Sequence, residues 1–347
     1  MSSKGRRYNR YAEPKLNMKK VLGVIVAILV IVMVIVSIVN VIKNGKDKNK
    51  VKSYSYYTAY ENGKFGVINS DGEIVINPEY SEIIAIPNKD VPIFVCTYDV
   101  NDQDGTYKTK VINQKNEEIF KNYDKVEAID NFDSKQNIWY EDNVLRVQKD
   151  GKYGLINFDG KEILACDYEE IIALKGVTNN LLVKKDGKVG LVNEKGQTII
   201  NTEYKEIKTL KEGYKNEYII VNDNNQYGII STTGTVLVEP KYEDVKYLNN
   251  SELFAVKEAG VWKLVNKDNE ILIDGGYDSI IEAKGENVVV EKGGKYGVVT
   301  TKNEEKIPVE YEEIKYTFSI YYIAKTGGKY GIINLSNEQV KDFNYVN

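Results

Sequence analysis

A short motif restarts eight times between Lys64 and the last residue of this chain. It reads glycine, lysine, an aromatic residue, glycine, two aliphatic residues and, in most copies, asparagine. Five clear copies begin at Gly63, Gly151, Gly187, Gly294 and Gly328, and looser copies contain Gln226, Val261 and Lys110. Each unit of such a repeat must bury its apolar face against the next unit. The repeat therefore predicts one continuous array and says little about a ligand.

Three positions recur at the same phase in these copies. In seven copies a tyrosine follows the motif glycine, or the residue in its place, by 14 residues, and the second copy is one residue shorter. A residue required at one phase of a repeat usually packs units together, and glycine permits close approach of the backbone. The positions that we assign to packing are Phe65, Gly66, Tyr80, Tyr153, Gly154, Tyr168, Gly190, Tyr204, Tyr227, Gly228, Tyr242, Trp262, Tyr277, Tyr296, Gly297, Tyr311, Tyr330, Gly331 and Tyr345.

The third copy shows the strand pattern most clearly. Apolar runs at 181–183, 190–193, 198–201 and 207–210 are separated by turn residues such as Asp186-Gly187 and by Tyr204. Asp-Gly and Lys-Gly pairs between valine and isoleucine runs are strong hairpin signals, and four short strands are the content of a propeller blade. We predict an all-β repeat domain, a β-propeller of about eight four-stranded blades, with an open β-solenoid or superhelical array of β-meanders as the alternative.

The two ends of the array suggest how a ring would close. The chain stops at Asn347, without the strand that we expect after the repeat tyrosine. The segment Val51–Tyr54 resembles the segment beginning at Ile314, which joins the seventh unit to the eighth. Ring closure hides the edge strands that an open array exposes. We therefore expect residues near Val51–Tyr54 to complete the last blade.

Val21–Ile42 is an uncharged stretch of 22 residues, 15 of them valine or isoleucine. At about 1.5 Å per residue it spans roughly 33 Å, enough to cross the hydrocarbon core of a bilayer as a helix. A cleavable signal peptide has a shorter apolar region and ends in a small-residue site. An uncleaved transmembrane anchor is therefore the prediction.

Charge around this segment sets the expected topology. Residues 1–20 carry seven basic side chains against Glu13 alone, and five lysines lie at 43–52. The flanking Lys19-Lys20 pair favours a cytoplasmic N-terminus. We predict a basic cytoplasmic segment at 1–20, a transmembrane helix at 21–42, a polar linker at 43–52 and the repeat domain at 53–347. Together these segments predict a single-pass cell-membrane protein whose repeat domain lies outside the membrane.

Composition excludes several functions. The chain has no histidine, so histidine-based catalysis and most transition-metal sites are excluded. From Ser53 onward 35 basic residues stand against 49 acidic ones, a net charge of −14, which disfavours nucleic acid as a partner. No phosphate loop or nucleophile elbow occurs. We predict no catalytic residue, cofactor or metal, and expect Cys96 and Cys166 to be small buried hydrophobic residues.

The motif, its turn glycine and the tyrosine together resemble the bacterial WG repeat, also called the KWG repeat. The resemblance covers roughly residues 54–347. Tyrosine or phenylalanine stands where that family usually has tryptophan, and Trp262, the one tryptophan in phase, is followed by Lys263 instead of glycine. Val189 and Lys110 depart from the pattern as well. The resemblance implies a β-rich array in a surface or signalling protein and supplies no catalytic residue.

Longer spacing separates the first three copies, with extra residues at 86–110 and 130–144. Insertions that break the period of a repeat usually lie in loops, where recognition is often placed. The first insertion contains Asp102 and Asp104 in a sequence that resembles part of a calcium loop, although a solvated turn fits it better. The second contains Trp139 and Tyr140, either an aromatic platform or the start of a strand. These four residues form the candidate recognition loop.

Together these features predict a membrane-tethered, non-enzymatic binding or scaffolding module outside the cell membrane. Its expected partner is a protein or an envelope glycan. One alternative is an exported propeller-type glycan hydrolase that uses paired carboxylates. Another is a membrane-anchored sensor whose array lies in the cytoplasm.

Overall fold

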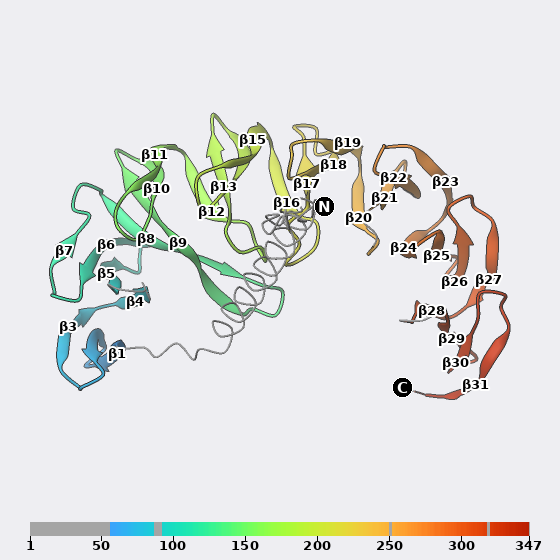
Figure 1. The fold of residues 1–347 in the computed structure, drawn as a ribbon, viewed down its shortest axis with the longest axis horizontal. Helices are drawn as coiled ribbons and strands as arrows, with labels where there is room; N and C mark the ends of the chain where they lie inside the picture. Colours follow the sequence, from blue (N-terminus) through green and yellow to red (C-terminus); the bar gives the residue numbers. More distant parts are fainter. Residues whose placement is uncertain (1–55, 87–91, 250–251, 318–319, 347) are drawn as a thin grey trace, which may run out of the picture. The chain divides into compact units, whose positions relative to one another are not determined.

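In the computed structural model the chain divides into two compact units, residues 1–55 and 56–347. The structure describes residues 56–86, 92–249, 252–317 and 320–346. The expected transmembrane segment Val21–Ile42 and the expected closing segment Val51–Tyr54 lie outside these residues. The second unit is an all-β repeat of antiparallel sheets that follow one another along the chain (Figure 1).

Eight sheets, numbered here sheet 1 to sheet 8 in chain order, contain all 31 strands of the described residues. Sheets 1 to 4 contain β1(Tyr56–Glu61), β2(Lys64–Asn69), β3(Ile74–Tyr80); β4(Glu82–Ile86), β5(Ile93–Asn101), β6(Thr106–Asn113), β7(Glu118–Ile119); β8(Lys125–Phe132), β9(Ile138–Lys149), β10(Lys152–Ile156), β11(Glu162–Tyr168); and β12(Glu170–Ala173), β13(Asn180–Lys185), β14(Lys188–Asn193), β15(Thr198–Tyr204). Sheets 5 to 8 contain β16(Glu206–Thr209), β17(Glu217–Val221), β18(Tyr227–Ser231), β19(Val236–Tyr242); β20(Asp244–Tyr247), β21(Leu253–Glu258), β22(Val261–Asn266), β23(Ile271–Tyr277); β24(Ser279–Lys284), β25(Asn287–Lys292), β26(Lys295–Thr300), β27(Glu305–Tyr311); and β28(Glu313–Tyr316), β29(Tyr322–Thr326), β30(Lys329–Ile333), β31(Gln339–Tyr345).

The recurring aromatic and tyrosine positions are direct cross-strand partners. In sheet 5, Tyr227 of β18 pairs with Tyr242 of β19, and the register then shifts so that Ile229 pairs with Val238. The motif glycine, Gly228, lies between these two pairs. A Cβ atom on Gly228 would lie 2.5 Å from the backbone oxygen of Val238. The last strand therefore bulges across the glycine, at a place where a side chain would crowd the neighbouring backbone.

The same geometry recurs through the array. The ideal Cβ position of each motif glycine lies 2.5–2.9 Å from a backbone oxygen of the neighbouring strand at Gly66, Gly154, Gly190, Gly228, Gly297 and Gly331. Where Lys263 replaces the glycine in sheet 6, the register shift between Trp262–Tyr277 and Leu264–Ile273 is still present. The bulge is thus a property of the repeat, and glycine is the residue that accommodates it with least conflict.

The asparagine that ends the motif closes the next turn. Asn69 Oδ1 accepts hydrogen bonds from the backbone nitrogens of Asp71 and Glu73 at 3.0 and 2.9 Å. Asparagine residues with the equivalent pair of bonds, at 2.8–3.1 Å, are Asn113, Asn157, Asn193, Asn266 and Asn334. An asparagine side chain that bonds the backbone two residues ahead fixes a turn locally. The motif therefore specifies both a strand and the hairpin that follows it.

The tyrosines also connect one sheet to the next. The Tyr277 hydroxyl of sheet 6 donates to Asn303 Oδ1 in a turn of sheet 7, and Tyr311 of sheet 7 donates to Asn337 in sheet 8. The acidic residue after the tyrosine accepts a backbone N–H from the next sheet's hairpin, as Glu312 does from Gly328 at 3.1 Å. Each repeat thereby fixes the position of the one that follows.

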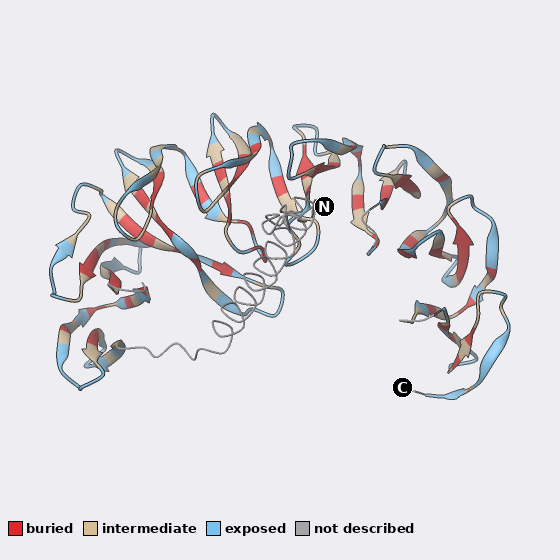
Figure 2. Ribbon diagram, viewed as in Figure 1, coloured by how far each residue is buried: buried red, intermediate tan, exposed pale blue. Residues whose placement is uncertain are grey.

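The buried residues lie mainly in the strands, as Figure 2 shows. They cluster where one sheet packs against the next. The β-branched residue of each first strand is at most 7 % exposed at Ile83, Val126, Ile171, Ile207, Val245, Ile280 and Ile314. Ile280 and Val290 of sheet 7 share one core cluster with Leu264 of sheet 6. Burying such a side chain contributes about 1.5–3 kcal/mol relative to leaving it exposed. The core is therefore divided among the junctions between sheets.

One sequence-based prediction is wrong in its strand phase. The strand after the repeat tyrosine was expected to be the fourth strand of the same unit, but β16 after Tyr204 pairs with β17 in the following sheet. Sheet 8 consequently has its four strands, β28 to β31, and lacks no strand after Tyr345. Among the described residues it is sheet 1 that holds three strands. Tyr204 is the last residue of β15, and the residues from Glu206 onward pair in the following sheet.

The two cysteines are free and differ in their surroundings. Cys96 of β5 is 0 % exposed, and burial raises the pKa of its thiol to about 12. Cys166 of β11 is only partly buried. The expectation of two buried residues therefore holds for Cys96 and only partly for Cys166.

The repeat tyrosine is expected to contribute to stability only where a following sheet covers it. Tyr242 is 1 % exposed, whereas Tyr345 at the same repeat position is 62 % exposed. Truncating a large buried aromatic residue costs about 3–5 kcal/mol. Tyr242→Ala should lower the thermal unfolding midpoint clearly, and Tyr345→Ala should change it little. Circular dichroism melting of both variants checks this, and equal losses would contradict the assignment.

Candidate recognition site

Both insertions consist largely of strand, contrary to the expectation of loops. The first forms the long hairpin of β5 and β6, whose ladder continues to the pair Asn101–Thr106, and residues 87–91 lie outside the described residues. The second extends β8 and β9 as far as the pair Phe132–Ile138. We call this extension, residues 130–142, the insertion hairpin. Its backbone is hydrogen-bonded along its length, so its side chains are presented by a strand ladder.

The insertion hairpin leaves sheet 3 through a bulge. The register of β8 and β9 shifts between Ala128 and Asp130, and Asn143 in this region has a positive φ of 67°. A bulge bends a strand and increases its twist. Beyond it the hairpin carries exposed apolar residues, with Ile138 71 %, Phe132 42 % and Tyr140 38 % exposed.

Buried polar side chains hold the base of the insertion hairpin. Asn131, 1 % exposed, donates to Glu141 Oε1 at 2.7 Å and accepts a hydrogen bond from the Gly176 nitrogen at 3.0 Å. The second carboxylate oxygen of Glu141 accepts from the Asn179 nitrogen. Burial raises the pKa of Glu141, and the two hydrogen bonds oppose that shift. Glu141 is thus committed to joining sheet 3 to the β12–β13 loop of sheet 4.

The tip of the hairpin is tied to a third repeat. The carboxylate of Glu212, in the β16–β17 loop, accepts hydrogen bonds from the Ser134 nitrogen at 2.5 Å and from its hydroxyl at 2.9 Å. Glu212 passes close to Gly176, where a Cβ atom would lie 2.9 Å from its Cγ atom. The Gly213 nitrogen also donates to the Gly176 oxygen at 2.8 Å. Segments of sheets 3, 4 and 5 are therefore joined at one place.

A groove of ≈ 290 Å³ lies at this junction, lined by Asp133, Trp139, Gly176, Thr178, Glu212 and Gly213. Trp139 supplies an aromatic face, and Asp133 and Glu212 supply carboxylate oxygens. Hydrogen bonds from Asn137 hold the pKa of Asp133 below its ordinary value, so this group is charged at neutral pH. Nearby, Lys175 Nζ lies 4.7 Å from the Phe132 ring centroid. Aromatic residues such as Trp139 and Phe132 are enriched at recognition surfaces.

The predicted candidate residues separate into two places. Trp139 and Tyr140 both lie at the start of β9, on the insertion hairpin. Asp102 and Asp104 lie in the β5–β6 turn, where Asp104 Oδ1 accepts from the Thr106 nitrogen and hydroxyl. These bonds lower the pKa of Asp104. The described residues contain no cluster of three or more cysteine and acidic residues suited to a metal ion.

Sequence reasoning missed Asn131, Glu141 and Glu212 as parts of the site. Nothing in the local pattern around Glu212 links it to Ser134, since 78 residues separate them. No local signal marks Asn131 either, because β8 also contains Lys125, Glu127 and Asp130. Its burial depends on the loop of the next sheet, which the sequence alone does not place.

Three segments of the chain match the family model described as the WG containing repeat, at residues 65–91, 190–227 and 227–262. The matches fall on sheets 1, 2, 4, 5 and 6 and follow the same glycine and tyrosine positions. They support the interpretation of the chain as a WG-repeat protein. No curated protein matches the sequence.

Solved structures resemble the chain only distantly. A crystal structure of a eukaryotic initiation factor is 8 % identical, covers 82 % of this chain and 84 % of its own, and has a TM-score of 0.36. The Neurospora crassa Pan2 WD40 domain is 12 % identical, covers 60 % of this chain and 76 % of its own, and has a TM-score of 0.26. PorZ of Porphyromonas gingivalis is 9 % identical, covers 84 % of this chain and 40 % of its own, and has a TM-score of 0.28. These scores support no conclusion about shape or function.

Within the part of the chain that the structure describes, no helix has the length and apolar character needed to cross a bilayer.

The link between Ser134 and Glu212 generates a local prediction. Glu212→Ala removes both acceptors of Ser134, so the tip of the insertion hairpin should open more often. Hydrogen exchange should accelerate at residues 133–137, with little change in the unfolding midpoint. Glu162→Ala, an exposed carboxylate of the same sheet 3, is the control and should leave exchange at the tip unchanged. Unaltered exchange in the Glu212 variant would show that the link does not hold the hairpin.

Proposed function

We propose that this protein is a membrane-tethered, non-enzymatic binding scaffold whose repeat array lies outside the cell membrane. The insertion hairpin is its recognition element, and a protein or envelope glycan is its partner. One observation carries the recognition assignment. A hairpin that interrupts the repeat period is held by buried hydrogen bonds to the β12–β13 loop of sheet 4 and by exposed hydrogen bonds to Glu212 of the β16–β17 loop, while Ile138, Phe132 and Tyr140 face solvent.

The exposure of these side chains supports binding over packing. Three exposed large apolar residues gather on this one hairpin: Ile138 is 71 %, Phe132 42 % and Tyr140 38 % exposed. Tryptophan and tyrosine are enriched among the residues that dominate binding energies at interfaces. The polar network formed by Asn131, Glu141 and Glu212 preorganises this surface, which lowers the entropy lost on binding.

The chemistry of the site favours a scaffold over the hydrolase alternative. A glycosidase needs two accessible carboxyl groups, one of them with a raised pKa. Glu141 has a raised pKa but is 3 % exposed and accepts hydrogen bonds from Asn131 and Asn179. Glu212 is engaged by Ser134. Both carboxylates therefore serve to position the hairpin in this proposal.

Membrane attachment rests on the sequence of Val21–Ile42, and the outward orientation rests on Lys19-Lys20 and the neighbouring basic residues. In this arrangement the lysine-rich spacer at 43–52 lies between the bilayer and the acidic repeat array.

The recognition assignment predicts the effect of altering the hairpin. Full-length protein in detergent should capture a partner from solubilised envelope, and Ile138→Ser with Tyr140→Ser, two changes at exposed positions, should abolish that capture without lowering the unfolding midpoint. Ile74→Ser is the matched control, because Ile74 is 63 % exposed on sheet 1, remote in sequence from the hairpin. Capture that survives the double change, or fails equally in the control, would contradict the recognition assignment.

Topology is tested separately. Protease added to intact, wall-stripped cells should digest residues beyond Lys43 and leave residues 1–20 protected, because only the array is outside. Complete protection of the array would favour the cytoplasmic sensor instead. This outcome is independent of the capture experiment.

A further inference from the structure

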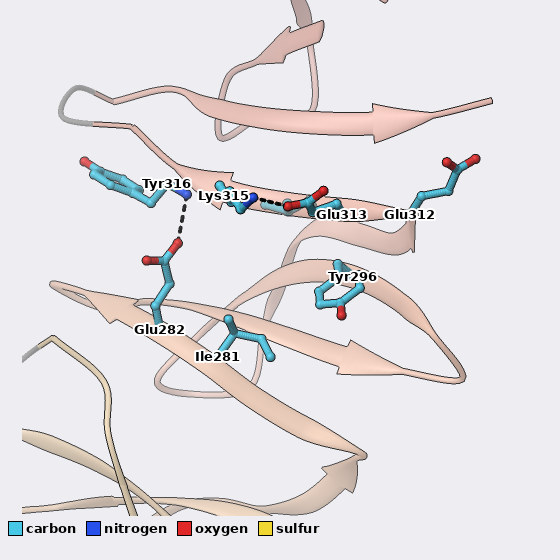
Figure 3. A pocket seen from close by; sticks show the side chains of 8 residues that line it. Ile281, Glu282, Tyr296, Glu312, Glu313, Lys315 and Tyr316 are labelled. Carbon is cyan, nitrogen blue, oxygen red and sulfur yellow. Dashed lines mark hydrogen bonds and ion pairs between the residues drawn. The ribbon is translucent and has the colours of Figure 1, made fainter. Parts of the chain in front are cut away.

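A second groove, of ≈ 560 Å³, lies between sheets 7 and 8. Figure 3 shows Ile281 and Glu282 of β24 on one side, Glu312 to Tyr316 on the other, and Tyr296 of β26 between them. The volume falls in the range of small-ligand sites. Tyr296 is the motif aromatic of sheet 7, so every other sheet with a motif aromatic offers an internal comparison.

In four other sheets the motif aromatic is covered by a cation of the same chain. Lys246 Nζ lies 3.8 Å from the Trp262 ring centroid and Lys208 Nζ lies 5.1 Å from that of Tyr227. Arg146 and Lys325 each lie 5.3 Å from the rings of Tyr153 and Tyr330. A cation over an aromatic face is attracted by the quadrupole of the ring. In sheet 1, Tyr60 lies 4.8 Å from Phe65 instead.

Among the motif aromatics of the described residues, Tyr296 has neither a cation nor a second aromatic ring over it. Lys208 and Lys246 occupy the fourth position after the preceding repeat tyrosine, and Ile281 has that position in sheet 7. A bulge places Ile281 and Glu282 together opposite Val289, so two residues without positive charge fill the place of the lysine. On the neighbouring strand, Glu291 pairs with Tyr296 where Lys325 pairs with Tyr330 in sheet 8.

The walls of this groove are acidic. Glu282, Glu312 and Glu313 line it against one lysine, Lys315, giving three negative charges and one positive charge. Lys315 forms an ion pair with Glu313, which also accepts a hydrogen bond from Tyr330 at 2.8 Å. These two interactions lower the pKa of Glu313. Glu282 accepts a hydrogen bond from the Tyr316 nitrogen at 2.8 Å and Glu312 accepts one from the Gly328 nitrogen at 3.1 Å, so both carboxylates are held in place without an ion pair in the lining. Lys284, outside the lining, lies 4.1 Å from the Tyr316 ring centroid.

We propose that the groove at Tyr296 binds an external cation, the ammonium or guanidinium group of a partner's basic side chain. The cation takes the place that Lys208 and Lys246 fill over Tyr227 and Trp262. Two independent observations converge on this chemistry: a motif aromatic without a cation over it where sibling repeats carry one, and a groove lining with three glutamates against one lysine. This site is separate from the insertion hairpin and does not depend on the function proposed for it.

The decisive variant supplies the cation internally. Ile281→Lys restores the lysine of the sibling repeats and should occupy the groove. A fluorescein-labelled pentapeptide with two lysines, titrated by anisotropy into full-length protein in uncharged detergent, should bind the wild type. Its affinity should fall about tenfold or more in this variant and about tenfold in Tyr296→Leu. The same peptide with norleucine in place of lysine should not bind.

Ile172→Lys is the matched control. It adds the same charge at the same repeat position of sheet 4, where Ile172 is 39 % exposed and the motif residue is Val189 in place of an aromatic. Peptide affinity should stay within about twofold of the wild type, since only long-range charge changes. Equal losses in both lysine variants, or no binding of the peptide to the wild type, would overturn the proposal. A folded Ile281→Lys protein with unaltered affinity would overturn it as well.

Competition with spermidine distinguishes two sources of the same chemistry. A side chain held within a peptide should bind more tightly than the free polyamine, because flanking backbone contacts the groove walls. Spermidine that displaces the peptide at equal or lower concentration would overturn the assignment to a partner's side chain and leave a free polyamine as the ligand. The unfolding midpoint of each variant, measured in parallel, shows whether a lost signal reflects a lost fold.

Discussion

The close passage of one strand over a glycine is the contact on which the rest of the array depends. At Gly228 the backbone oxygen of Val238 occupies the space where a side chain would begin. The register shift that results brings Tyr242 opposite Tyr227, at the end of the sheet. Without the bulge the tyrosine would be displaced along the ladder, and because side chains alternate between faces, even a one-residue slip would turn it to the wrong face.

The position of the tyrosine explains why the repeats form a continuous array. From the end of the last strand its ring and hydroxyl reach the turn of the following sheet, as Tyr311 reaches Asn337. The acidic residue after it engages the next hairpin, and the β-branched residue two positions further enters the next core. A single four-residue stretch, such as Tyr311–Ile314, thus ends one sheet, joins the two and begins the next. The stability of each sheet consequently depends on its neighbours, as in other repeat proteins.

Much of this fold could be predicted from the sequence because its signals are local. Glycine, asparagine and tyrosine recur at fixed spacing, and strands in the third copy lie where the apolar runs are. The assignment of β16 to the wrong sheet shows the limit of local reasoning. An apolar run after Tyr204 is equally compatible with either sheet, and only hydrogen bonds to Glu206–Thr209 from β17 decide between them.

The candidate site was predictable only in part, for a related physical reason. Trp139 and Tyr140 stand out because they interrupt the period. The groups that hold them, Asn131 and Glu212, act through partners in other repeats, so their roles depend on tertiary structure. Asp102 and Asp104 were grouped with them by sequence, yet the partners of Asp104 lie within its own turn.

A regular array makes departures from regularity informative. Where every unit solves the same packing problem, a residue that differs at one phase has lost or gained a specific interaction. In sheets 5 and 6 a lysine lies over the motif aromatic: Lys208 over Tyr227 and Lys246 over Trp262. In sheet 7 Ile281 stands in place of that lysine, Tyr296 remains, and three glutamates line the groove beside it. Stability would be served as well by keeping the lysine, so the combination points to binding as the property that this repeat has gained.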